Sequence, residues 1–191
     1  IDFLTDSPGI YTLIVTDISN DCKDTTTVEI TRDQNIPIAL ASPDTTLTCA
    51  RTDLNLSSLG SSTGQDILHI WTTVDGNIVG TDTTEMPLID SEGLYYLLVQ
   101  NSTNDCEIID SVYVTLDTIS PNAQIDKSII PTITCDSVFV TLDASLSGSL
   151  DSLEFKWQGG ATSPIIEVFQ PGIYEVTVCH QRTGCTSEDF I

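Results

Sequence analysis

The chain has 191 residues, of which 28 are acidic and 6 are basic, and its formal net charge is −22. This charge repels nucleic acid and anionic membrane surfaces, so neither is expected as a partner. No apolar stretch approaches the ~20 residues that a membrane-spanning helix needs, and no membrane insertion is expected.

Residues 1–33 predict the C-terminal part of a β-domain. Gly9-Ile-Tyr11 opens a run in which apolar and polar residues alternate, and Cys22 follows thirteen residues after the glycine. Alternation with period two is typical of half-buried strands. A second alternating run ends at Ile30. We therefore expect two strands here, belonging to a truncated repeat.

Residues 37–117 predict a complete domain. The same motif recurs as Gly93-Leu-Tyr95, again with a cysteine, Cys106, thirteen residues after the glycine. Runs of Thr, Ser, Asn, Asp and Gly separate the alternating segments, as turns do. About seven short strands in ~80 residues are typical of an immunoglobulin-like sandwich.

Residues 121–191 repeat this pattern. Thr46-Leu-Thr-Cys49 recurs as Thr132-Ile-Thr-Cys135, and the Gly-x-Tyr motif recurs as Gly172-Ile-Tyr174, followed by Cys185. The interval from Trp157 to Gly172 is shorter than the interval from Trp71 to Gly93 in the preceding repeat, which predicts the loss of a hairpin. The fold class is therefore all-β, with tandem immunoglobulin-like sandwiches of roughly seven strands each. We expect this last repeat to lack the end of its final strand.

The two ends of the chain fall inside repeats. Ile1 corresponds to Glu85, so we expect the chain to be a window cut from a longer protein. The alternative is that residues 1–33 are a true subunit terminus that completes a neighbour's domain by strand addition.

Five aromatic residues recur at matching positions. Trp71 and Trp157 are expected on the third strand of each sandwich, where a tryptophan packs in the core. Tyr11, Tyr95 and Tyr174 are expected to form corners in which the hydroxyl bonds back to the backbone. The alternative is sugar binding by aromatic stacking.

The cysteine pattern predicts disulfides rather than a zinc site. Six cysteines are present with no Cys-x-x-Cys pair and only two histidines. We expect Cys49 to pair with Cys106, and Cys135 to pair with Cys185. Each bond would join the start of an early strand to the start of the last one.

Two cysteines lack a predicted partner in the chain. Cys22 would pair with a cysteine upstream, whereas Cys179 has no counterpart in the other repeats. Cys179 is either free, or joined to another chain, or a competitor of Cys135 for Cys185. Disulfides persist in oxidising compartments, so we expect an extracellular location.

The abundant aspartates offer one candidate metal site. Asp33 and Asp117 occupy equivalent positions at the junctions between repeats, where calcium could stiffen the linker. No Asp-x-Asp-x-Asp-Gly loop occurs, and a solvated acidic surface is the favoured explanation of the many aspartates. No other cofactor is expected.

No catalytic motif is present. His69 and His180 lie at non-equivalent positions without a nucleophile motif beside them, and no Gly-x-Ser-x-Gly or His-Glu-x-x-His sequence occurs. We therefore expect a protein that is not an enzyme.

Taken together, the Thr-Leu-Thr-Cys49 segment, Trp71, Gly93-x-Tyr95 and Asn104-Asp-Cys106 resemble the PKD-like and immunoglobulin-like repeats of large secreted Bacteroidota surface proteins, including adhesins and gliding-associated proteins. The resemblance implies export by the type IX system and a role at the cell surface. It also implies candidate O-glycosylation in Asp-Ser/Thr-apolar triplets, at Ser111, Thr118, Ser137 and Ser152.

Two functions fit this sequence. The first is a structural segment of a long surface fibre or adhesin stalk, whose partners are neighbouring repeats and other copies of the fibre. The second is a recognition module that binds a glycan or a protein, either as an adhesin or beside a secreted hydrolase. A binding repeat should carry a distinctive aromatic or charged loop. Neither the Asp75–Asp82 insertion nor the Gly159-Gly160 shortening is rich in aromatics, which favours the structural function.

Overall fold

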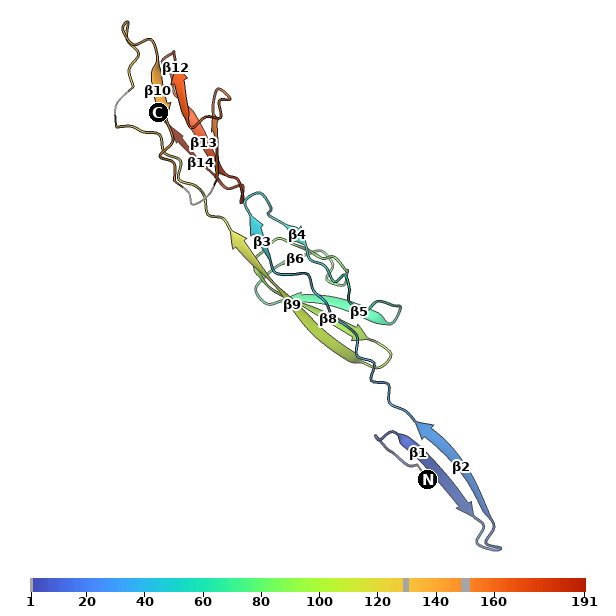
Figure 1. Cartoon of the computed structure of the whole chain (residues 1–191). Coiled ribbons are helices and arrows are strands. Elements are labelled where there is room, and N and C mark those ends of the chain that lie inside the picture. The colour runs from blue at the N-terminus through green and yellow to red at the C-terminus, as the bar shows by residue number, and fades with distance from the viewer. Residues whose placement is uncertain (1, 129–130, 149–151) are drawn as a thin grey trace.

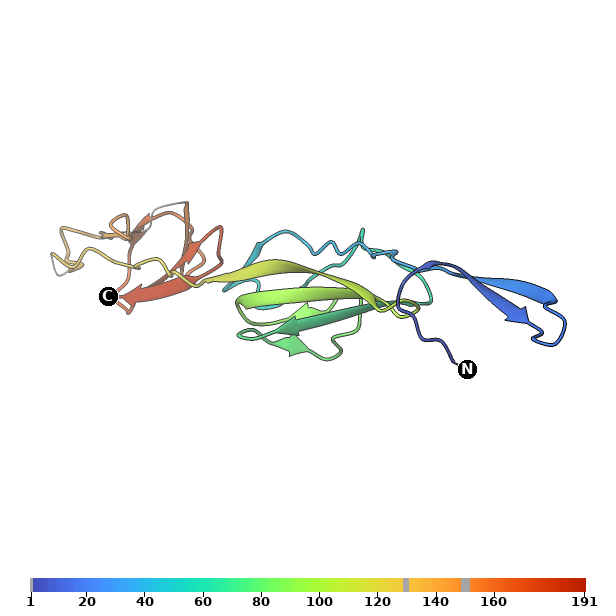
Figure 2. The same cartoon turned by 90° about the horizontal axis from the view of Figure 1, so that it is seen from below.

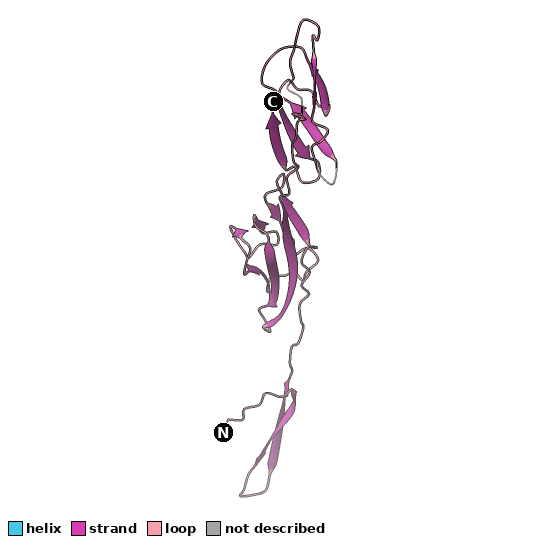
Figure 3. Cartoon of the chain, turned by 90° about the vertical axis from the view of Figure 1, so that its left-hand side faces the viewer, coloured by secondary structure: helices cyan, strands magenta, loops and turns pink. Residues whose placement is uncertain are grey.

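The computed structural model describes residues 2–128, 131–148 and 152–191, and it places three units end to end (Figure 1). All regular structure in these ranges is β-strand (Figure 3). The elongated shape persists when the molecule is turned, with the N-terminal hairpin and the C-terminal unit at opposite ends (Figure 2). Within the described ranges, no helix has the length and apolar character needed to cross a membrane.

The first unit is a single β-hairpin. Strand β1 (Gly9–Thr16) pairs antiparallel with β2 (Lys23–Ile30). The side chains of Leu13, Val15 and Val28 are 58–60% exposed. Nothing in residues 2–33 packs a second sheet over them. The hairpin is therefore a two-stranded sheet whose apolar side chains are open to solvent.

The middle unit is a seven-stranded sandwich. Its strands are β3 (Thr45–Thr48), β4 (Leu54–Asn55), β5 (Ile67–Thr73), β6 (Ile78–Val79), β7 (Leu88–Ile89), β8 (Gly93–Asn101) and β9 (Cys106–Asp117). One sheet has the order β3-β9-β8-β5 and the other has the order β4-β7-β6. Strand β3 runs parallel to the end of β9, with Thr48 opposite Asp117, and the other pairs are antiparallel.

Alternate residues of both sheets form the core of the middle unit. Tyr95, Leu97 and Val99 on β8 are fully buried, while the residues between them are partly exposed. Trp71 on β5 is also fully buried. The period-two pattern of the sequence thus becomes one apolar face on each sheet.

The third unit has a smaller sandwich. Its described strands are β10 (Val140–Asp143), β11 (Leu153–Trp157), β12 (Ile165–Val168), β13 (Glu175–His180) and β14 (Thr186–Phe190), in sheets β10-β12 and β11-β13-β14. Trp157 is 2% exposed in its core. Along the chain, one strand, β12, separates β11 from β13, whereas two strands, β6 and β7, separate β5 from β8. In its described residues, the third unit therefore lacks an equivalent of the β6–β7 hairpin, as the shorter interval between Trp157 and Gly172 predicts.

The third unit therefore shows five described strands rather than roughly seven. The counterpart of β3, residues 131–134, is not a strand. In the middle unit the equivalent segment, β3, is a strand because it pairs with Val114–Asp117 of β9.

The three units share one hairpin register. Tyr11 lies opposite Val28 and Tyr95 lies opposite Val112. Tyr174 exchanges two backbone hydrogen bonds, each of 2.9 Å, with Ile191. The repeated Gly-x-Tyr-to-Cys motif is therefore a repeated hairpin, and the all-β tandem immunoglobulin-like fold class is confirmed.

An aspartate clamp that the sequence analysis did not predict closes each sandwich. In the middle unit, Asp110 Oδ2 accepts the Ala41 N–H at 2.8 Å. In the third, Asp189 Oδ2 accepts the Ile125 N–H at 2.8 Å. Asp110 and Asp189 each follow the motif cysteine by four residues, which was the available signal. Each clamp ties the segment that enters a unit to that unit's last strand.

Candidate functional site: the junction between the middle and third units

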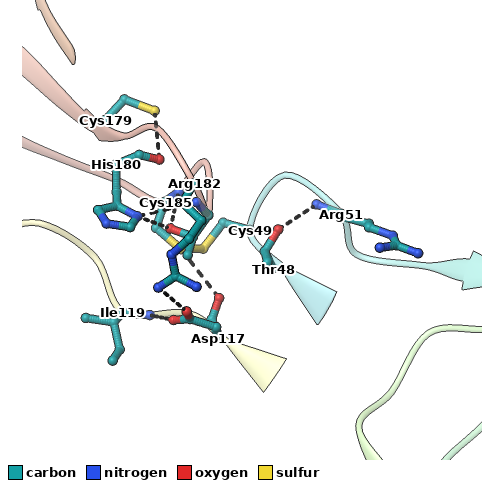
Figure 4. The surroundings of a disulfide bond; sticks show 10 residues. Thr48, Cys49, Arg51, Asp117, Ile119, Cys179, His180, Arg182 and Cys185 are labelled. Atoms are coloured by element: carbon teal, nitrogen blue, oxygen red, sulfur yellow. Dashed lines mark hydrogen bonds and ion pairs between the residues drawn. A yellow bond between two sulfur atoms is a disulfide. The ribbon is translucent and has the colours of Figure 1, made fainter. Parts of the chain in front are cut away.

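Strand β3 ends in a tight turn with Cys49 and Ala50 at its tip. The Thr48 N–H donates to the Arg51 carbonyl at 2.9 Å, and the Arg51 N–H donates back to the Thr48 carbonyl at 3.1 Å. The parallel pairing of β3 with β9 puts this turn beside Asp117, where the chain leaves the middle unit. Cys49 consequently lies where the third unit begins (Figure 4).

The facing turn connects β13 to β14. The Gly184 N–H donates to the His180 carbonyl at 2.8 Å, and the His180 N–H donates to the Cys185 carbonyl at 2.9 Å. Gly184 has a φ of 67°, in the left-handed region that favours glycine. The buried Thr183 hydroxyl lies 2.9 Å from His180 Nδ1. These bonds hold Cys185 in a defined turn.

A disulfide joins the two turns. Cys49 and Cys185 are bonded, with their Cα atoms 5.0 Å apart across a sequence separation of 136 residues. Beside the bond, the Ala50 N–H donates to the Thr183 carbonyl at 3.0 Å. The middle and third units have separate cores, so this bond links two domains to each other.

An ion pair adds a third contact at the junction. The Arg182 guanidinium lies 2.9 Å from Asp117 Oδ2, and Asp117 Oδ1 accepts the Ile119 N–H at 3.3 Å. The Arg182 side chain is 65% exposed, so the pair contributes at most about 1 kcal/mol. Its main effect is to orient the linker against the turn.

The predicted disulfide pairs, Cys49–Cys106 and Cys135–Cys185, are wrong. Cys106 begins β9, whereas Cys49 lies beside Asp117 at the other end of the same strand. At about 3.3 Å per residue, these ends are roughly 36 Å apart. A disulfide spans at most ~7 Å between Cα atoms, so Cys49 is far beyond the reach of Cys106. Cys135 is the counterpart of Cys49, and its predicted partner, Cys185, is bonded to Cys49.

Four cysteines are free thiols: Cys22 and Cys135 are exposed, and Cys106 and Cys179 are half-buried. Cys179 lies opposite Thr186 on β14, and its Sγ is 3.8 Å from the His180 carbonyl oxygen. Because Cys185 is bonded to Cys49, Cys179 does not bridge the hairpin.

The repeated tyrosines form the corners expected of them. Each hydroxyl donates to the carbonyl four residues earlier: Tyr11 to Ser7 at 2.7 Å, Tyr95 to Ser91 at 2.7 Å and Tyr174 to Gln170 at 2.8 Å. Burial raises the pKa of the Tyr95 hydroxyl, and the carboxylates of Asp90 and Asp75 raise it further. Tyr95, Trp71 and Trp157 are buried in the cores, whereas Tyr11 and Tyr174 are half-buried.

The two histidines are held by local hydrogen bonds. His69 Nδ1 lies 2.8 Å from the Ser58 hydroxyl, and Nε2 lies 2.8 Å from the Ser62 carbonyl. His180 is part of the β13–β14 turn. Both rings are buried, and these contacts give each a structural role.

Of the remaining predicted sites, Asp117 is half-buried and the others lie on the surface. Asp33 Oδ1 accepts the Asn35 N–H at 3.0 Å, whereas the Asp117 carboxylate faces Arg182. In the described ranges, no three His, Cys, Asp or Glu residues come together as a metal site would require. The candidate glycosylation residues Ser111, Thr118, Ser137 and Ser152 are all exposed.

Sequence reasoning missed two residues of the junction, Arg182 and Gly184. Neither has a matching residue type in the other repeats: Thr103 and Asp105 take these positions before Cys106, and Ser19 and Asp21 take them before Cys22. The departure from the repeat was the available signal.

No protein-family model and no curated protein matches the chain. Among solved structures, it is similar to the N-terminal eight Ig domains of Down Syndrome Cell Adhesion Molecule isoform 1.30.30 (12% identity, 96% of this chain and 30% of that chain, TM-score 0.47). It is also similar to the human desmocollin-1 ectodomain (14% identity, 89% of this chain and 38% of that chain, TM-score 0.33). Four Ig domains of Dscam1 isoform 9.44 match at 16% identity, with 94% of this chain, 53% of that chain and a TM-score of 0.35. The chain thus spans about half or less of each of these structures.

Proposed function

We propose that the chain is a non-catalytic structural segment of a long extracellular fibre or adhesin stalk. The Cys49–Cys185 bond carries this proposal, because it fixes two consecutive domains to each other rather than stabilising one domain. A disulfide within one domain would be enough to stabilise the fold of that domain. A stalk gains resistance to bending and separation there.

The end-to-end arrangement and the charge support the same function. The units follow one another along one axis (Figure 1), so each added unit would extend the reach of the molecule. The net charge of −22 opposes adhesion between neighbouring fibres. A disulfide also fits an oxidising, extracellular location. We infer that the chain belongs with the PKD-like and immunoglobulin-like repeats of secreted Bacteroidota surface proteins, on the motifs around Cys49, Trp71 and Tyr95.

Under tension, the disulfide also transmits force directly between the two domains. Force applied between the ends passes from Cys49 to Cys185, so it bypasses the 136-residue separation between them. In the chain-entropy model, closing a loop of this size stabilises the folded state by about 5 kcal/mol. In a stalk that is pulled from its ends, the bond would prevent the residues between Cys49 and Cys185 from extending.

Single-molecule pulling from the two ends tests the function. Oxidised protein should unfold without extending the segment between Cys49 and Cys185. Reduction should then release about 490 Å of additional contour, at ~3.6 Å for each of the 136 bypassed residues. Equal extension in both states would contradict a load-bearing role. Selective binding of residues 37–117 in a glycan array would instead favour the recognition function.

A further inference from the structure

Each cysteine of the junction has counterparts in the other repeats. Cys49 corresponds to Cys135, and both end a Thr-x-Thr-Cys segment; we call them strand-end cysteines. Cys185 corresponds to Cys106 and Cys22, and all three follow the Gly-x-Tyr motif; we call them turn cysteines. The observed bond therefore joins the strand-end cysteine of one repeat to the turn cysteine of the next.

The two strand-end cysteines sit in the same kind of turn. The Thr134 N–H donates to the Ser137 carbonyl at 3.0 Å, as the Thr48 N–H does to Arg51 at 2.9 Å. Cys135 is thus held at the tip of its turn, as Cys49 is. It is exposed and free.

The turn cysteines also share a local structure. A side-chain oxygen two residues earlier accepts each cysteine N–H: Asn20 for Cys22 at 2.9 Å, Asn104 for Cys106 at 2.9 Å and Thr183 for Cys185 at 3.3 Å. The residue just before each cysteine has a positive φ: 56° at Asp21, 56° at Asp105 and 67° at Gly184. The three turns therefore present their thiols in the same way.

The turn before Cys106 already contacts the preceding linker. Asn104 Nδ2 donates to the Asn35 carbonyl at 3.2 Å. At the bonded junction, Arg182 of the equivalent turn contacts Asp117, the last residue of β9, where the preceding linker begins. Cys106 thus lies at the junction with the first unit, where the front half of a sandwich would bring a strand-end cysteine.

The first unit shows what that front half would cover. Tyr11, Leu13 and Val15 of β1 correspond to Tyr95, Leu97 and Val99 of β8, which are fully buried. On β1, Leu13 and Val15 are 60% and 58% exposed. Tyr11 and Leu13, together with Phe3 and with Val28 of β2, border an open groove of about 600 Å³. The chain's own middle repeat shows that strands equivalent to β3–β7 fit this face.

We propose that the Cys49–Cys185 bond is one member of a series, in which every strand-end cysteine bonds to the turn cysteine of the following repeat. Cys106 forms a disulfide with the strand-end cysteine of the repeat whose sandwich includes the β1–β2 hairpin. Cys135 forms a disulfide with the turn cysteine of a repeat placed after Ile191. Each bond forms by exchange with a disulfide oxidant, which accepts two electrons and two protons and leaves as two thiols.

A C-terminal extension tests the partner of Cys135. Ile191 corresponds to Val112, so residues 113–191 appended after Ile191 restore the end of the last strand and add one more repeat. The added turn keeps Gly184, as at the observed junction. In a glutathione redox buffer, Cys135 should bond to the added copy of Cys185, as identified by non-reducing peptide mapping. A matched extension with Ser in place of the added Cys185 should leave Cys135 open to alkylation.

An N-terminal extension tests the partner of Cys106. Residues 37–84 placed before Ile1 supply the missing front half, because Ile1 corresponds to Glu85. The Gly184 turn has no space for a Cβ beside Ala50, whereas the Cys106 turn carries Asp105. The extension is therefore made with Asp105 and with Asp105→Gly. The added copy of Cys49 should bond to Cys106 in at least the Asp105→Gly form.

Formation of Cys49–Cys185 in the same samples shows that the original junction has folded and oxidised. The proposal is overturned if Cys135 and Cys106 both remain alkylatable in these samples, or if an added cysteine bonds within its own repeat, as the added Cys49 would with Cys22. The series rests on the proposed stalk function. Failure of the series would leave the pulling result for Cys49–Cys185 unchanged, so it can be distinguished from failure of the stalk function itself.

Discussion

Gly184 packs against Ala50 so closely that a Cβ on the glycine would overlap the Ala50 side chain. The contact brings the β13–β14 turn near enough for the Ala50 N–H to reach the Thr183 carbonyl at 3.0 Å. The disulfide between the domains thus forms beside a backbone contact that only a glycine permits.

Gly184→Ala should therefore weaken the junction. The variant adds an overlap with Ala50 and a left-handed conformation that alanine disfavours, at a combined cost of about 2–4 kcal/mol. The fraction of Cys49–Cys185 at equilibrium with glutathione should fall. Gly160→Ala is the matched control, because Gly160 also has a positive φ, of 88°, but nothing within 4 Å of its Cβ position. If Ala50→Gly fails to restore the disulfide in Gly184→Ala, the overlap is not the cause.

Tyr95→Phe should destabilise the middle repeat by about 1–3 kcal/mol. The change removes the hydroxyl that donates to the Ser91 carbonyl and accepts the Asn77 N–H at 3.0 Å, leaving buried groups unpaired. Tyr174→Phe removes only the bond to the Gln170 carbonyl, so its cost in the third repeat should be smaller. Hydrogen exchange resolved by repeat measures both. Equal costs would show that the Asn77 contact contributes nothing.

Trp157→Phe should cost about 1 kcal/mol more than Trp71→Phe. The Trp157 Nε1–H donates to the Ser163 carbonyl at 2.8 Å, whereas the buried Trp71 Nε1 has no partner among the described residues. Both changes remove the same volume, so the difference isolates one hydrogen bond. Urea unfolding followed by hydrogen exchange in each repeat provides the comparison. A larger loss for Trp71→Phe would contradict this reasoning.

The third repeat should lose stability in acid through Asp189. Burial raises the pKa of this carboxyl, but the hydrogen bonds from the Ile125 N–H, Lys127 and the Phe190 N–H together outweigh burial and lower it below its ordinary value. The stabilisation is fully present above the unfolded-state pKa of about 3.9 and is lost as pH falls through the lower folded-state value. Asp189→Asn should flatten this pH dependence, whereas Glu188→Gln, at an exposed neighbour, should not. Parallel melting curves from pH 5 to pH 2 give the comparison.

The features that the sequence predicted correctly are local. The hairpins, the tyrosine corners and the buried tryptophans each follow from residues a few positions apart, and three copies of the motif reinforce one another. Trp71 and Tyr95 could be placed because their neighbours alternate with period two.

The disulfide could not be predicted in the same way, because its partner depends on which end of the sandwich Cys49 occupies. That is set by the parallel pairing of Thr48 with Asp117, a contact between residues far apart in the chain. The sequence pattern puts both Cys49 and Cys106 at strand starts, which favours a bond within one domain, but it does not reveal that they lie at opposite ends of β9. The Asp189 and Asp110 clamps also depend on such distant contacts.

Non-reducing peptide mapping of the oxidised chain tests most directly whether consecutive repeats are covalently joined. Mass spectrometry should find the peptide that contains Cys49 linked to the peptide that contains Cys185, with Cys106 and Cys135 alkylated. The contradicting result would be two disulfides within single domains, Cys49–Cys106 and Cys135–Cys185, because consecutive domains would then not be covalently joined at their junction.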